Sequence, residues 1–141
     1  MPLPNTKSPS ECERGSAMIE FFLFGILLMV PLSLGIVDVA NYFSALMAGQ
    51  SAAREAARGY SLSPGSQLGA DNALMIANQV LTDSGIRYRD LKLRIICSTD
   101  PCLSSGASIR AYVDFRTDLR ILTPSIHVEE MQPVDSWVRS H

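Results

Sequence analysis

The sequence predicts an α+β protein in which a long N-terminal helix continues into a small head, where a second helix packs on a small antiparallel sheet. Three observations support this fold class. An apolar run fills Ala17–Val37, and helical spacing of apolar residues continues beyond it. A second stretch with helical spacing covers 67–83. After that stretch the apolar period changes from about 3.6 to 2, which is typical of strands.

The apolar run is long enough to cross a membrane. It holds about 21 residues, and at ~1.5 Å per residue such a helix spans the hydrocarbon core of a bilayer. Pro31 lies inside the run and is expected to kink or locally break the helix. Glu20 lies near its start, and a carboxylate at mid-membrane costs roughly 2.5–3.5 kcal/mol or more. We therefore expect a membrane helix over about 17–38 in which Glu20 has a partner or a function.

The helix is expected to continue past the membrane, so that it covers 16–59 and stops at Gly59. Residues 50–58 are rich in strong helix formers, and glycine is a common residue at helix ends. Small residues recur at every fourth position in two rows. The first row is Ala45, Gly49, Ala53 and Ala57, and the second is Ala48, Ala52 and Ala56. These rows allow close helix packing, either against neighbouring subunits or against the protein's own head.

Residues 60–141 are expected to form the head. Its helix over 67–83 ends at Ser84-Gly85, with Gly85 as the residue after the cap. The predicted apolar stripe of this helix is Leu68, Leu74, Ala77, Val80 and Leu81. Alternating patterns predict strands over 91–95, 109–115 and 126–131. Residues 117–123 either continue the second strand or form an apolar flap, and Trp137 is expected to cover one end of the sheet.

Two cysteines enclose a short loop with the sequence CSTDPC. In an oxidising compartment Cys97 and Cys102 would form a disulfide bond. The alternatives are two free thiols or a metal pair, and no second ligand pair accompanies these cysteines. We therefore expect a Cys97–Cys102 disulfide, no metal and no other cofactor.

Composition and motifs argue against nucleic-acid binding and against catalysis. The formal net charge is −2, and there is no basic stripe with interleaved aromatic residues. His127 and His141 are the two histidines, and neither has a second ligand at metal-binding spacing. No glycine-rich phosphate loop follows a strand. We expect neither a nucleic-acid partner nor an enzymatic activity.

The N-terminal third of the chain resembles the TadE-like family. The resemblance rests on the segment RGSAMIEF at 14–21, on the apolar run with Pro31, Gly35 and Asp38, and on AAREAAR at 52–58. Both the order and the spacing of these motifs fit the family. Members are minor pilins or pseudopilins of the bacterial tight-adherence (Flp-type) pilus system.

The resemblance implies that residues 1–15 are a prepilin-type leader and that prepilin peptidase cuts between Gly15 and Ser16. Glu20 and Phe21 then become the fifth and sixth residues of the mature chain, the Glu-aromatic pair of Flp-type prepilins. The protein would cross the bacterial inner membrane once, with a cytoplasmic N-terminus and a periplasmic head. Its partners would be the peptidase, membrane lipid, other pilins or pseudopilins and the inner-membrane assembly platform of pili used for adhesion and biofilm formation.

Cleavage would also give Glu20 a partner. It creates an α-amine at Ser16 that is positive at neutral pH, one helical turn from Glu20. The amine of the same chain or of a neighbour would then pair with Glu20 and set the register between subunits. The alternative is a solvated Glu20 at the headgroup level. For the whole chain, the alternative is an uncleaved single-pass membrane protein whose periplasmic head is a protein-interaction module.

Overall fold

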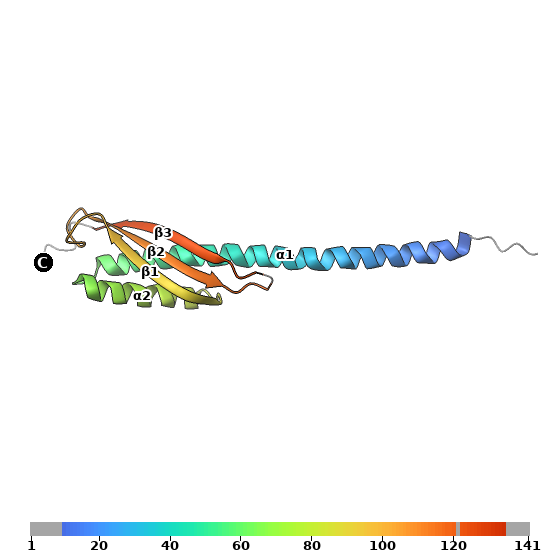
Figure 1. Ribbon diagram of the computed structural model, residues 1–141, viewed down its shortest axis with the longest axis horizontal. Helices are drawn as coiled ribbons and strands as arrows, with labels where there is room; N and C mark the ends of the chain where they lie inside the picture. Colours follow the sequence, from blue (N-terminus) through green and yellow to red (C-terminus); the bar gives the residue numbers. More distant parts are fainter. Residues whose placement is uncertain (1–9, 121, 135–141) are drawn as a thin grey trace, which may run out of the picture. The chain divides into compact units, whose positions relative to one another are not determined.

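The computed structural model describes residues 10–120 and 122–134, with side chains from residue 17 onward. Its elements are α1 (Ser10–Ser61), α2 (Ser66–Asp83), β1 (Tyr88–Cys97), β2 (Ser108–Thr117) and β3 (Ser125–Pro133) (Figure 1). The predicted α+β fold class is confirmed. Most of the predicted leader and the predicted position of Trp137 lie outside the described residues.

The chain forms two compact units, Met1–Val37 and Asp38–His141. We call the second unit the head from here on, so the head includes the C-terminal part of α1. In the first unit, α1 runs without interruption through Pro31, so the proline does not divide the helix.

The ends of α1 differ from the predicted ends. The helix begins at Ser10 instead of residue 16, and it ends at Ser61 instead of Gly59. Gly59 does not stop the helix but allows close packing, because a Cβ there would lie 2.2 Å from Ile76 Cδ1 of α2. The last turn is closed by hydroxyl groups: Ser61 Oγ donates to the carbonyl of Arg58 at 2.8 Å, and Ser63 Oγ donates to the carbonyl of Gly59 at 2.9 Å.

The sheet of the head is antiparallel, with strand order β1-β2-β3. Each strand includes the segment that the alternation of apolar residues predicted, and each is longer than that segment at both ends. The central strand β2 buries one face completely, with Ile109, Ala111 and Val113 at 0% exposure. Ile109 and Val113 belong to one core cluster with alanines of α1 and α2, and Figure 1 shows the sheet alongside these two helices. The core of the head therefore lies between one sheet and one helical layer.

Helix α2 covers its predicted range but buries a different face. Leu68 and Leu74, predicted in the apolar stripe, are 61% and 44% exposed. The buried residues are Gly69, Ala73, Ala77 and Leu81. Small residues at this spacing allow the close approach that Gly69 makes to Tyr60 of α1, which leucines would prevent. Gly85 follows the cap with φ +68°, as predicted.

The ambiguous segment after β2 does not extend that strand. Thr117 ends β2, and its N–H donates to the carbonyl of Pro124 at 3.1 Å. The N–H of Leu119 donates to the carbonyl of Leu122 at 2.9 Å. Residues 118–124 therefore form the turn between β2 and β3, with residue 121 outside the described part of the chain.

Candidate functional site

The predicted cleavage bond lies within helical backbone. Gly15 and Ser16 both belong to α1, which starts five residues before Gly15. Four residues after Ser16, Glu20 is exposed on the same helix, about 6 Å of helix rise away. Phe21 is 77% exposed and its ring meets Phe22 edge-to-face, with ring centroids 6.4 Å apart. The structure thus places Glu20 and Phe21 on an accessible surface one turn beyond the predicted cut.

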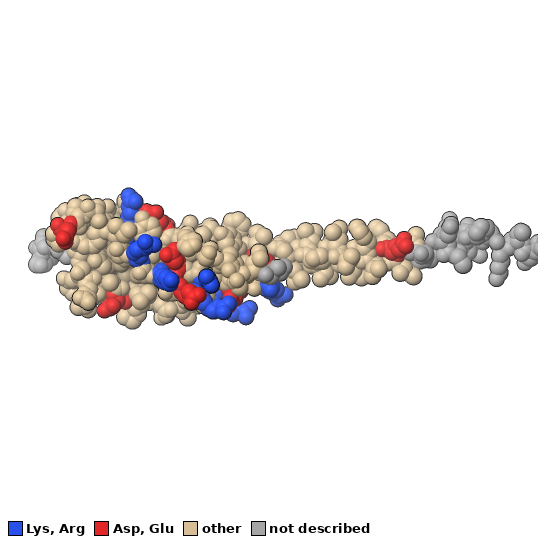
Figure 2. Space-filling view, in the orientation of Figure 1, with Lys and Arg blue, Asp and Glu red and all other residues tan. Residues whose placement is uncertain are grey.

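The first unit presents apolar side chains to its surroundings in every direction. Glu20 is the single charged residue between Ala17 and Val37, and Figure 2 shows an almost uncharged surface along this part of α1. The helical stretch Ala17–Ser61 contains a window with a mean hydropathy of 2.3, of which 6% is buried. A helix that is apolar on all sides and remains exposed matches a membrane environment rather than water. The described part of the chain therefore has one helix, near its N-terminus, that is long and apolar enough to cross a membrane.

The small-residue rows of α1 pack inside the head. Ala45, Ala53 and Ala57 are all at 0% exposure. A Cβ on Gly49 would lie 2.9 Å from Phe115 Cε1 and 3.0 Å from Val128 Cγ2. The second row, Ala48, Ala52 and Ala56, is equally buried. Both rows therefore serve the protein's own head, and neither offers accessible surface to a neighbouring subunit in this fold.

Asp38 marks the point where α1 enters the head. It is only 6% exposed, and its Oδ1 accepts a hydrogen bond of 3.3 Å from the backbone N–H of Arg120. Asp38 lies in the segment that resembles the TadE-like family, but its structural role could not be predicted from the sequence. An acidic residue directly after the apolar run was the available signal, but its partner lies 82 residues later.

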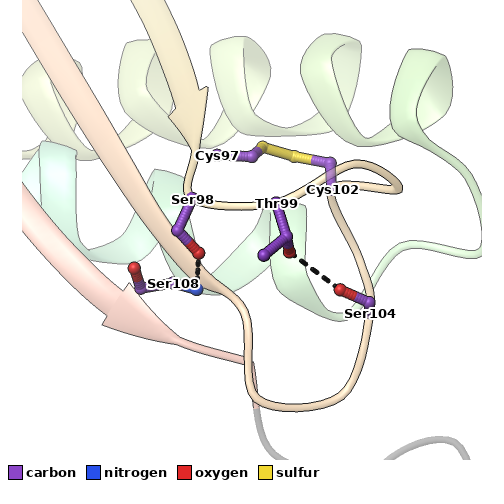
Figure 3. The surroundings of a disulfide bond; sticks show 6 residues. All are labelled: Cys97, Ser98, Thr99, Cys102, Ser104 and Ser108. Atoms are coloured by element: carbon purple, nitrogen blue, oxygen red, sulfur yellow. Dashed lines mark hydrogen bonds between the residues drawn. A yellow bond between two sulfur atoms is a disulfide. The ribbon is translucent and has the colours of Figure 1, made fainter.

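The two head cysteines form a disulfide bond, with their Cα atoms 5.2 Å apart. The loop that they enclose is also held by hydroxyl groups (Figure 3). Ser98 Oγ accepts a hydrogen bond of 2.9 Å from the N–H of Ser108, and the Thr99 and Ser104 hydroxyls lie 2.9 Å apart. The predicted Cys97–Cys102 pair is confirmed. Within the described residues, no three His, Cys, Asp or Glu side chains are grouped so that they could hold a metal ion.

The outer face of the sheet carries ion pairs and an open pocket, which is lined by Asp90, Lys92, Asp114, Phe115, Arg116, Ser125 and His127. Arg110 pairs with Glu129 at 3.4 Å, and Arg94 lies over the ring of Tyr112 with 5.5 Å to the centroid. His127 faces solvent beside Asp114. These contacts cross between neighbouring strands and stabilise the sheet modestly, by a few tenths of a kcal/mol to about 1 kcal/mol each.

Comparison with protein families gives one result. The family model described as TadE-like protein matches residues 15–58. Searches of the curated proteins and of the solved structures found no match. The resemblance to the TadE-like family is thus confirmed, and the matched segment begins at Gly15 and ends with the basic residue Arg58 in the last turn of α1.

Proposed function

We propose that the protein is a minor pilin or pseudopilin that takes part in assembling a tight-adherence (Flp-type) pilus and is processed by prepilin peptidase. The observation that carries the proposal is the TadE-like segment, which begins at the residue before the proposed cut. The exposed apolar surface that follows, with Glu20 as its one charge, supports the same function. The role is structural and involves no catalysis by this chain.

The proposed processing has a clear physical consequence for Glu20. Cutting after Gly15 leaves a charged α-amine on Ser16, near the start of the apolar surface. A carboxylate in hydrocarbon is tolerated when it has an opposite charge, and the amine of the same or a neighbouring chain supplies it. Glu20 and Phe21 would then set the register between subunits.

The proposed location is the bacterial inner membrane, with a cytoplasmic leader and a periplasmic head. The Cys97–Cys102 disulfide supports this orientation, because disulfides persist in the periplasm and are rare in the cytosol. The proposed partners are prepilin peptidase, other pilins or pseudopilins, the assembly platform and membrane lipid. Adhesion and biofilm formation would follow from the pilus.

The test is the intact mass of the protein expressed with and without prepilin peptidase. We expect loss of residues 1–15 when the peptidase is present, with cleavage of the major pilin in the same cells as the positive control. Gly15→Leu should block the cut. Gly25→Leu is the matched control, because Gly25 lies on the same helix and a Cβ at this position would meet no atom within 4 Å. A wild-type chain that still begins at Met1 beside a processed major pilin would reject the proposal.

One observation favours a second candidate function. Helix α1 begins at Ser10 and passes through the Gly15–Ser16 bond, whereas a protease needs an extended segment. We therefore keep an uncleaved single-pass membrane protein with a protein-interaction head as the alternative. The same mass measurement separates the two functions, because only the first predicts a shortened chain.

A further inference from the structure

The end of the head at which α1 enters carries the 118–124 turn, in which the described residues Arg120, Leu122 and Thr123 are exposed. Antiparallel pairing of the three strands places this turn at the same end as the loop 84–87 that precedes β1. Within the head, Figure 1 shows both segments at that end of the sheet. The hydrogen bond from Arg120 N–H to Asp38 holds the turn beside the first residue after the apolar run. Residues at this end of the head therefore lie close to where the chain leaves its apolar segment.

This end of the head is basic and carries an exposed apolar side chain. Leu122 is 64% exposed. Four arginines belong to this end: Arg87, Arg89, Arg116 and Arg120. Three aspartates accompany them: Asp38, Asp90 and Asp118. Figure 2 shows basic and acidic side chains intermixed in a band across the head, with several basic side chains at this end.

Two of the three aspartates contribute little free negative charge. Asp38 is buried, and Asp118 is paired with Arg89. Hydrogen bonding to Asp118, together with its negative charge, raises the pKa of Arg89 above its usual value. The Arg89–Asp118 pair carries no net charge, which leaves Arg87, Arg116 and Arg120 against Asp90. The exposed charge of this end is therefore mainly positive.

The opposite end of the sheet differs in both respects. Its loop, residues 98–107, contains no Lys or Arg and has Asp100 as its one charged residue. The large apolar side chain of this loop, Leu103, is only 4% exposed, whereas Leu122 points outward. The loop is also closed by the disulfide (Figure 3). The 98–107 loop therefore offers neither the exposed apolar side chain nor the arginines found at the end next to the apolar run.

We propose that residues 118–120 and 122–124, together with Arg87, Arg89 and Arg116, form a membrane-contact surface that binds anionic lipid headgroups, with Leu122 reaching the apolar boundary. Basic residues next to a membrane span are attracted to anionic lipid within about one Debye length, roughly 8–10 Å. The hydrogen bond from Arg120 N–H to Asp38 keeps the turn beside the first residue after the apolar run. The inference rests on membrane anchoring by α1 and is independent of the proposed role in pilus assembly.

The test uses the full chain reconstituted in vesicles of phosphatidylcholine, with or without phosphatidylglycerol, containing lipids brominated near the headgroup end of the acyl chain. The Trp137→Phe background removes the one native tryptophan. Leu122→Trp should then lose most of its fluorescence, with stronger quenching in phosphatidylglycerol vesicles. Ser105→Trp, exposed in the opposite loop, is the matched control and should keep most of its fluorescence.

Two further variants make the result decisive. Thr123→Trp repeats the measurement at an exposed neighbour in case Leu122→Trp fails to fold, which loss of the Cys97–Cys102 disulfide would reveal. Replacing Arg87 and Arg120 by Gln should remove most of the difference between the two vesicle types. Equal quenching at both ends of the head, or quenching independent of phosphatidylglycerol, overturns the proposal. Neither outcome depends on peptidase or pilus, so this inference and the proposed function can fail separately.

Discussion

Phe115 of β2 fills the space beside Gly49 of α1, where a Cβ would lie 2.9 Å from Phe115 Cε1. Phe115 is only 2% exposed and belongs to the set of largest buried side chains of the head. The glycine thus lets the sheet approach the C-terminal part of α1. The contact therefore fixes the sheet to the part of α1 that belongs to the head.

The first prediction tests this contact. Gly49→Ala should lower the free energy of unfolding of the head by about 1–2 kcal/mol, because crowding against the Phe115 ring outweighs the gain in helix propensity. The measurement is thermal or denaturant unfolding of the full chain in detergent, followed by near-UV circular dichroism. Gly25→Ala is the control: its Cβ would meet nothing within 4 Å, so the head should keep its stability. Equal stability of the Gly49 variant and wild type would show that the sheet shifts without cost.

The second prediction concerns the thiols. The intact chain has three cysteines, two of them joined in the head. Without reductant we expect Cys12 alone to react with a maleimide in the unprocessed chain, and no thiol to react after removal of residues 1–15. With reductant, both forms should gain two reactive thiols.

Breaking the same disulfide tests its contribution to stability. Cys97→Ser together with Cys102→Ser should lower the stability of the head by about 2 kcal/mol, the value expected for a loop this short. Cys12→Ser is the control and should leave unfolding of the head unchanged. Labelling of either head cysteine without reductant would contradict the predicted disulfide in the cell.

The sequence predicted the type of every element, because apolar periodicity reports which segments are half-buried helices or strands. It did not predict which face of α2 is buried. Leucines stand out in a hydrophobicity pattern, but the close approach of α2 to Tyr60 is set by the absence of a side chain at Gly69. Gly59 is a similar case. Its residue type predicts a helix end, but in the structure its missing side chain leaves room for Ile76.

The residues of the candidate site also fall into two groups: those that the sequence points to, and those whose role depends on a contact with a distant part of the chain. Gly15, Ser16, Glu20 and Phe21 could be predicted as a processing and assembly site because they lie close together in the sequence and share one motif, and that site stays a prediction. The role of Asp38 could not, since its hydrogen bond to Arg120 spans 82 residues. Spacing within a segment carries no information on such a contact. The alanine rows were recognised as packing surfaces, but only the burial of Ala45 and Ala53 shows that their partner is the head.

The third prediction tests Glu20. Glu20→Ala should leave membrane insertion intact, since it removes a charge from the apolar run, and it should strongly reduce pilus number. Membrane fractionation and electron microscopy of the cells measure the two effects. Leu27→Ala is the matched control, an exposed apolar residue on the same helix, and it should have little effect on either. Normal piliation in the Glu20 variant would remove Glu20 from the proposed assembly mechanism.

The fourth prediction concerns the anchoring of the 118–124 turn. Asp38→Ala removes the acceptor for the N–H of Arg120, and a lost hydrogen bond of this kind costs about 1–3 kcal/mol when the donor stays unsatisfied. We expect faster amide hydrogen exchange in this turn and faster proteolysis after Arg120, with exchange in β2 little changed. Asp38→Asn keeps a carbonyl oxygen at the same place and should retain most of the protection. If Asp38→Asn speeds exchange as much as Asp38→Ala does, the charge of Asp38 matters more than its hydrogen bond. If neither variant changes exchange, the turn is held by its own backbone contacts, such as the hydrogen bond from Leu119 N–H to the carbonyl of Leu122.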